Sequence, residues 1–110
     1  MYINKAEAVA PEVVREGVHI RWLITSKDGA PNFAMRLIEL APGIVFQPHQ
    51  HPYEHEIYVL EGEGVVTDPT GDTGKMAPGK FIYMPPDEPH GYKNTGDVTL
   101  KFICVIPNQD

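Results

Sequence analysis

The sequence has few of the features that mark several large protein classes. Its 110 residues include one cysteine, Cys104, so the chain forms no internal disulfide and suits a reducing compartment. No apolar run approaches the roughly 20 residues that a transmembrane helix needs. Residues 1–7 lack the charged and apolar regions of a secretion signal. We therefore expect a cytoplasmic protein with no membrane partner.

Basic residues are scarce as well. Nine lysines and arginines stand against fifteen aspartates and glutamates, which gives a formal net charge of −6. Nucleic acids attract clustered positive charge, so this acidic balance argues against a nucleic-acid partner. No internal repeat, linker or shift in composition marks a boundary, and we expect residues 1–110 to form a single domain.

The chain is instead rich in turn-forming residues, with ten glycines and eleven prolines spread along its length. They separate short segments rich in β-branched and aromatic residues, a pattern typical of an all-β sandwich or barrel. Residues 1–17 read as irregular or weakly extended. Strands are expected at 18–25, 33–40, 44–51, 55–60, 63–68, 79–84, 90–94 and 97–106. Every second residue from Val98 to Ile106 is apolar, so this face is expected to line the barrel interior.

Histidine is concentrated in one place. Of five histidines, His49, His51 and His55 fall within seven residues. On an extended strand His49 and His51 project from the same face, and the turn at Pro52 lets His55 fold back beside them. Neutral imidazole is a general ligand of first-row divalent metals, so the cluster predicts a metal site. His19 has no such partner, and we interpret it as an ordinary strand residue.

Two motifs support this interpretation. Residues 79–94 resemble the second cupin motif, G(X)5PXG(X)2H(X)3N, which places His90 in the site. Asp87 replaces its middle glycine, a mild departure because Asp tolerates positive φ better than most residues. Residues 43–62 resemble the first motif, G(X)5HXH(X)3,4E(X)6G, through His49 and His51. The resemblance implies a cupin fold, which is a double-stranded β-helix or jelly-roll barrel.

The fourth ligand of the first motif has two candidates. Glu56 satisfies the spacing after His51, whereas His55 satisfies the spacing before Gly62. Adjacent strand residues point to opposite faces, so only one of the two is expected to reach the metal. We favour His55, because Glu56 leaves five residues instead of six before Gly62.

With His55, the site consists of His49, His51, His55 and His90. Together with the stretches 30–36, 54–57 and 102–107, it is similar to the small single-domain manganese cupins that have four histidine ligands. That resemblance implies one Mn²⁺ ion and a homodimer. The affinity of imidazole for divalent metals predicts other ions. The Irving–Williams series favours copper, nickel, cobalt or zinc over manganese, and iron is a further alternative.

Four neutral ligands leave two positions of an octahedral ion open, which is typical of a catalytic site, and leave its full charge uncancelled. Ile57 and Tyr92 share the faces of His55 and His90, and the resemblance places Phe102 and Cys104 near the metal. These four are the predicted substrate pocket, with core packing as their alternative role, and Tyr92 is the candidate catalytic residue. We expect a dioxygenase-like oxidoreductase acting on a small organic substrate; the alternative is a non-catalytic ligand-binding or sensor protein.

Overall fold

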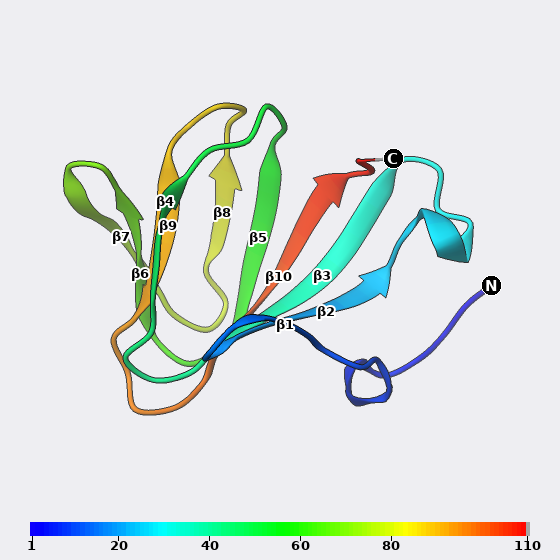
Figure 1. The fold of residues 1–110 in the computed structure, drawn as a ribbon, viewed down its shortest axis with the longest axis horizontal. Coiled ribbons are helices and arrows are strands. Elements are labelled where there is room, and N and C mark those ends of the chain that lie inside the picture. The colour runs from blue at the N-terminus through cyan, green and yellow to red at the C-terminus, as the bar shows by residue number, and fades with distance from the viewer. Residues whose placement is uncertain (110) are drawn as a thin grey trace.

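The computed structural model describes residues 1–109, which form two antiparallel β-sheets packed face to face (Figure 1). The larger sheet has six strands in the order β1-β2-β3-β10-β5-β8, and the smaller has four in the order β4-β9-β6-β7. This jelly-roll arrangement confirms the predicted all-β fold. The strands are β1 (Glu12–Arg15), β2 (Val18–Ile24), β3 (Phe33–Leu40), β4 (Val45–His49), β5 (His55–Glu61), β6 (Gly64–Asp68), β7 (Gly71–Met76), β8 (Phe81–Met84), β9 (His90–Asn94) and β10 (Leu100–Pro107).

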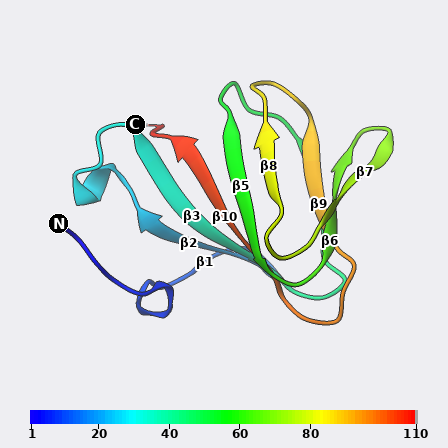
Figure 2. The ribbon, with the colours of Figure 1, turned by 180° about the vertical axis from the view of Figure 1, so that it is seen from behind.

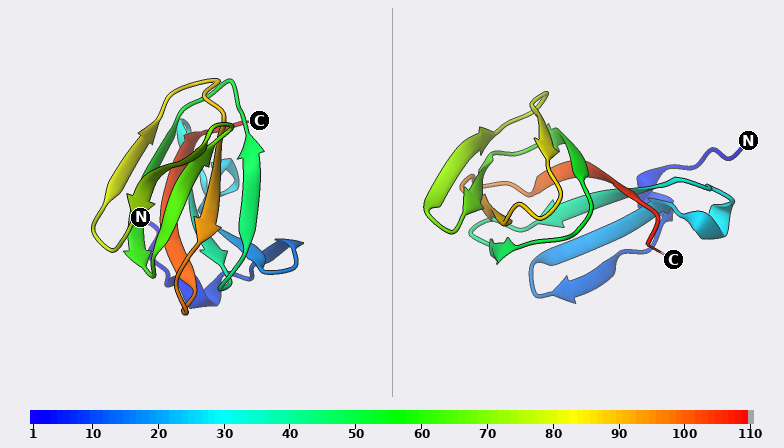
Figure 3. Two further views of the ribbon diagram at one scale, coloured as in Figure 1. Left: turned by 90° about the vertical axis from the view of Figure 1, so that its left-hand side faces the viewer. Right: turned by 90° about the horizontal axis from the view of Figure 1, so that it is seen from above.

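The two sheets enclose a barrel at one end of the molecule only. Strands β2, β3 and β10 fan away from the smaller sheet, and both chain ends lie on the side to which they fan (Figure 1). The view from behind shows β8 beside β5 and β9 beside β6 (Figure 2). From above, β6 and β7 lie at the far side from both termini (Figure 3). Two 3₁₀ helices complete the described chain, η1 (Ala6–Ala8) and η2 (Ser26–Asp28), and neither is long or apolar enough to span a bilayer.

The apolar core lies between the sheets, and β10 contributes its centre. Along this strand burial alternates strictly, because side chains of successive strand residues point to opposite faces. Leu100, Phe102, Cys104 and Ile106 are all at most 2% exposed, as the alternation predicts. Val98 is a correction to that prediction: it is 56% exposed and precedes β10, which begins at Leu100.

Two strands are absent from the sequence-based prediction. Strand β1 lies in the segment expected to be irregular or weakly extended, and β7 lies between two expected strands. Both are edge strands with almost no buried side chain, so neither carries an alternating apolar pattern. They are held by backbone pairing with β2 and β6, which sequence periodicity does not record.

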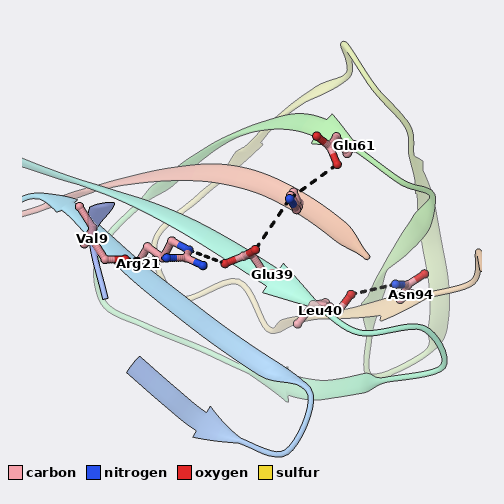
Figure 4. Close-up of polar contacts among 7 residues, drawn as sticks. Val9, Arg21, Glu39, Leu40, Glu61 and Asn94 are labelled. Atoms are coloured by element: carbon pink, nitrogen blue, oxygen red, sulfur yellow. Dashed lines mark hydrogen bonds and ion pairs between the residues drawn. The ribbon is translucent and has the colours of Figure 1, made fainter. Parts of the chain in front are cut away.

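Polar contacts join neighbouring strands on the outer face of the larger sheet (Figure 4). The Arg21 guanidinium on β2 donates to the Glu39 carboxylate on β3 at 2.8 Å and to the backbone oxygen of Val9 at 2.6 Å. Lys101 on β10 lies 4.0 Å from Glu39 and 3.7 Å from Glu61. These four charged side chains, from β2, β3, β10 and β5, are therefore paired with one another on the face away from the interior.

Candidate metal centre

Four histidines meet at one end of the barrel, and they come from both sheets. His49 ends β4 and pairs with His90, which begins β9, in the smaller sheet. His55 begins β5 in the larger sheet. His51 lies in the loop between β4 and β5. Pairing of β4 with β9 brings His90 next to His49, which precedes it by about 40 residues in the sequence.

The distances among three of these rings suit a shared cation. One ring nitrogen from each of His49, His51 and His90 can be chosen so that all three lie within 4.8 Å of one another. The ring centroids of His49 lie 4.6 Å from His51 and 4.7 Å from His90. Ligands about 2 Å from one metal ion lie at most about 4 Å apart, so small side-chain adjustments complete the site.

His55 lies in the same cluster, on the inner face of β5. Its ring centroid is 5.0 Å from that of His51 and 4.9 Å from that of His90. It is 3% exposed, whereas its neighbour Glu56 is exposed on the opposite face. Of the two candidates, only the His55 side chain faces the other histidines, and its role as a metal ligand stays a prediction.

The hydrogen bonds of the rings leave nitrogen lone pairs free for a metal. Nδ1 of His90 lies 2.8 Å from the backbone oxygen of Glu88, and Nδ1 of His49 lies 3.3 Å from that of Gln47. A carbonyl oxygen only accepts, so each Nδ1 carries the proton and each Nε2 the lone pair. Such a second contact is what orients metal-binding imidazoles.

Two buried ring nitrogens of this cluster have no partner within residues 1–109. They are Nε2 of His90 and Nε2 of His55. The other ring nitrogen of His55, Nδ1, lies 3.3 Å from Cys104 Sγ. A buried polar atom without a partner costs free energy, so two such atoms in one cluster indicate that the site is built for a ligand. A divalent cation fits this donor set, because it accepts several lone pairs at once.

Burial favours the neutral form of three of these histidines, His49, His51 and His55, and metal binding requires that form. It lowers the pKa of His51 to about 4 and that of His55 to about 3, with a smaller contribution from neighbouring positive charge, including that of Arg36. The pKa of His49 is lowered as well, again mainly by burial. These three rings are therefore neutral near neutral pH, and each has one ring nitrogen with a lone pair.

A cavity of about 50 Å³ adjoins the cluster. Tyr92, one of the predicted pocket residues, lines it and is 4% exposed. The other predicted pocket residues, Ile57, Phe102 and Cys104, are at most 2% exposed and belong to the surrounding core. The residues that line this cavity are Val18, Ile20, Arg36, Ile38, Leu40, Phe46, His49, His51, His55 and Tyr92.

Sequence reasoning overlooked Arg36, the cation in this lining. Its signal was present in the alternation of β3, where Ala34, Ile38 and Leu40 are buried and share its face. A charged residue on an apolar inner face is rare unless it is paired or functional. The apolar walls and one cation thus give the cavity a positive character even without metal.

A jelly-roll barrel with a histidine cluster at one end of its interior is a cupin-like architecture. Residues 36–106 match the family described as "Cupin domain", and the chain belongs to this family.

Several relatives are similar over most of this chain. The polyketide cyclase RemF of Streptomyces resistomycificus is 37% identical, with a TM-score of 0.90 over 97% of this chain and 79% of RemF. The uncharacterized protein MJ1618 of Methanocaldococcus jannaschii is 31% identical over 94% of this chain and 86% of its own length. The polyketide synthase CurC of Streptomyces cyaneus is 31% identical, and the matched region covers 81% of this chain and 58% of CurC.

Proposed function

We propose that this protein is a metal-dependent cupin enzyme in which His49, His51, His55 and His90 hold one divalent cation. The observation that carries the proposal is the set of four converging imidazoles, two of which have a buried Nε2 without a partner among the described residues. A bound cation would supply open coordination positions and Lewis acidity for a small, oxygen-rich substrate. We propose manganese as this cation, from the resemblance to four-histidine manganese cupins.

The reaction that we propose is of the oxygenase type. Within residues 1–109, no carboxylate that could serve as a general base lines the cavity, which disfavours proton-transfer reactions such as epimerisation. If both atoms of dioxygen enter the organic product, no external reductant is needed. The apolar walls formed by residues such as Ile38 and Phe46 would bind the carbon part of the substrate and exclude water.

Tyr92 has a defined protonation state in this proposal. Burial raises the pKa of its hydroxyl well above the usual value of 10. The phenol therefore remains protonated at any physiological pH and acts as a hydrogen-bond or proton donor to a substrate oxygen, not as a base. Replacement by Phe should lower turnover and leave metal content unchanged.

A second candidate is metal-assisted cyclisation of a polyketone. It is favoured by the similarity to the polyketide cyclase RemF, at 37% identity and a TM-score of 0.90. Both candidates share the bound metal and a substrate with neighbouring carbonyl oxygens. They differ in whether dioxygen is consumed, which makes them separable by one measurement.

The experiment has two parts. First, elemental analysis of purified protein should find one metal ion per chain, lost in His55→Ala and kept in the matched variant Glu56→Gln. Metal retained in the first and lost in the second would overturn the ligand assignment. Second, manganese- or iron-loaded protein is given dicarbonyl and alkene compounds in an oxygen electrode cell. Turnover without oxygen uptake supports the cyclase candidate, and binding without turnover leaves a ligand-binding protein.

A further inference from the structure

Arg36 occupies a special position in the larger sheet. It pairs in register with Trp22 on β2 and with Cys104 on β10, so the three residues form one row across the inner face. The guanidinium carbon lies 5.4 Å from the centroid of the Trp22 ring. One of its terminal nitrogens lies 3.0 Å from Cys104 Sγ. These two contacts fix the direction of the guanidinium group.

The positive charge of Arg36 has no carboxylate partner among residues 1–109. Its Nε is buried and also lacks a hydrogen-bond acceptor within that range. Arg21, on the outer face of the same sheet, shows the contrast, because the Glu39 carboxylate lies 2.8 Å from its Nε. An inward-facing arginine whose donors are only partly used is costly unless an anion completes its contacts.

Arg36 lines the same cavity as His49, His51, His55 and Tyr92. Its charge is one cause of the lowered pKa values of His51 and His55, which reflects its proximity to both. An anionic oxygen group placed in this cavity would supply the acceptor that the guanidinium lacks. The same molecule could present its other oxygens to the histidine cluster.

We propose that Arg36 is a specificity-determining residue that binds the carboxylate of a small 2-oxo or 2-hydroxy acid. This inference deepens the proposed function, since it names the substrate class of the same site. Four neutral imidazoles cancel none of the charge of a divalent cation, and Arg36 adds a further positive charge beside it. A site of this kind selects an anion over a neutral molecule of equal shape.

The test compares a charged and a neutral probe of nearly the same shape, pyruvate and pyruvamide. Their affinities are measured by calorimetry with zinc-loaded and with metal-free protein, in the wild type, Arg36→Gln and Arg36→Lys. Lys80→Gln is the matched control, because it removes the same charge from an exposed position. Trp22 is the chain's single tryptophan and lies on the guanidinium, so its fluorescence reports probe binding at Arg36.

Loss of a charge-assisted hydrogen bond should weaken pyruvate binding by Arg36→Gln about 10- to 100-fold. Pyruvamide binding should change little, Arg36→Lys should retain part of the pyruvate affinity, and Lys80→Gln should match the wild type. Equal weakening of both probes, unchanged pyruvate affinity in Arg36→Gln, or no pyruvate binding by the wild type in either form would overturn the inference. Metal content, measured on each variant, tests the proposed function separately, because Arg36→Gln should still take up one ion.

Discussion

The side-chain nitrogen of Asn94, at the end of β9, lies 2.9 Å from the backbone oxygen of Leu40, at the end of β3 (Figure 4). The same nitrogen donates to the backbone oxygen of Val98 at 2.9 Å, and the side-chain oxygen accepts from the Gly96 amide at 2.9 Å. Asn94 therefore ties the smaller sheet to the larger one and shapes the turn into β10. The last residue of the second cupin motif has a structural role in this chain.

Replacement of Asn94 by Ala should lower the free energy of unfolding by about 3 kcal/mol, because it leaves buried backbone oxygens without a donor. Urea unfolding followed by circular dichroism measures this change. Asn108→Ala is the matched control, since the Asn108 side chain donates to the backbone oxygen of Ala30 in a partly buried place. A loss no larger than that of the control would contradict the assigned role, and metal content should stay at the wild-type value in both variants.

Gly91 permits the close packing of β9 between its two neighbours. A Cβ atom there would clash with the backbone oxygen of Phe46 and lie 2.8 Å from both Pro48 N and Thr67 Oγ1. Gly91→Ala should therefore destabilise the fold by at least about 2 kcal/mol and weaken metal binding, because β4 must shift with His49. Gly74→Ala, which meets no atom within 4 Å, should change stability by less than about 0.5 kcal/mol. If the two variants were equally stable, β4 could move away from a Cβ atom at residue 91 without cost, and the explanation would be wrong.

Asp87 adopts the left-handed conformation, with φ of 64°. Its amide donates to the backbone oxygen of His51 at 2.6 Å, which joins the loops of the two motifs. Ala lacks the short polar side chain that tolerates this conformation, so Asp87→Ala should cost about 1 kcal/mol. Asp87→Gly should preserve stability, since Gly adopts positive φ without strain. Thermal unfolding compares the stability of the two variants. An alanine variant as stable as the glycine variant would refute the explanation.

The buried histidines should make the metal-free protein sensitive to acid. The pKa of His55 is lowered by burial to about 3 and that of His51 to about 4, whereas unfolded histidine titrates near 6.5. The unfolded chain therefore gains protons first, and stability falls as the pH decreases below about 6.5. Between pH 7.5 and pH 4.5 the free energy of unfolding should drop by about 2.7 kcal/mol for His55 alone.

Urea unfolding at a series of pH values tests this dependence. His55→Gln, which cannot be protonated, should show a flatter profile than the wild type over the same range. His19→Gln serves as the control, because Val18 and Ile20 on either side of His19 face the core, so the His19 side chain points to the opposite face of β2. Parallel profiles for the wild type and His55→Gln would count against the burial of a neutral ring at this position.

The sequence predicted those parts of the fold whose stability depends on side-chain alternation. The bounds of β3 and β9 agree with the expected segments 33–40 and 90–94, because apolar patterning and turn residues delimit both. Strands β1 and β7 escaped prediction, since their stability comes from backbone pairing at a sheet edge. Sequence reasoning therefore identifies strands that bury side chains and overlooks those that mainly complete a sheet.

The candidate site was likewise predicted in part. The histidine cluster was predictable because His49, His51 and His55 lie within seven residues, and alternation along β5 separates His55 from Glu56. The expectation that one strand carries both His49 and His51 was wrong, because β4 ends at His49 and His51 lies in the following loop. Arg36 could not be connected with it, because its neighbour Cys104 lies 68 residues later and only strand register brings the two together. Tertiary contacts between distant strands, unlike local spacing, leave no period in the sequence.

The four histidines come from both sheets and the loop between them, and this has a consequence for the stability of the fold. His49 and His90 belong to the smaller sheet and His55 to the larger one, so a cation held by all of them would cross-link the two halves of the barrel. Metal binding and folding would then be linked, and each would strengthen the other. In a cell deprived of the metal, the protein would be less stable and would be degraded sooner, so its abundance would follow the supply of the ion.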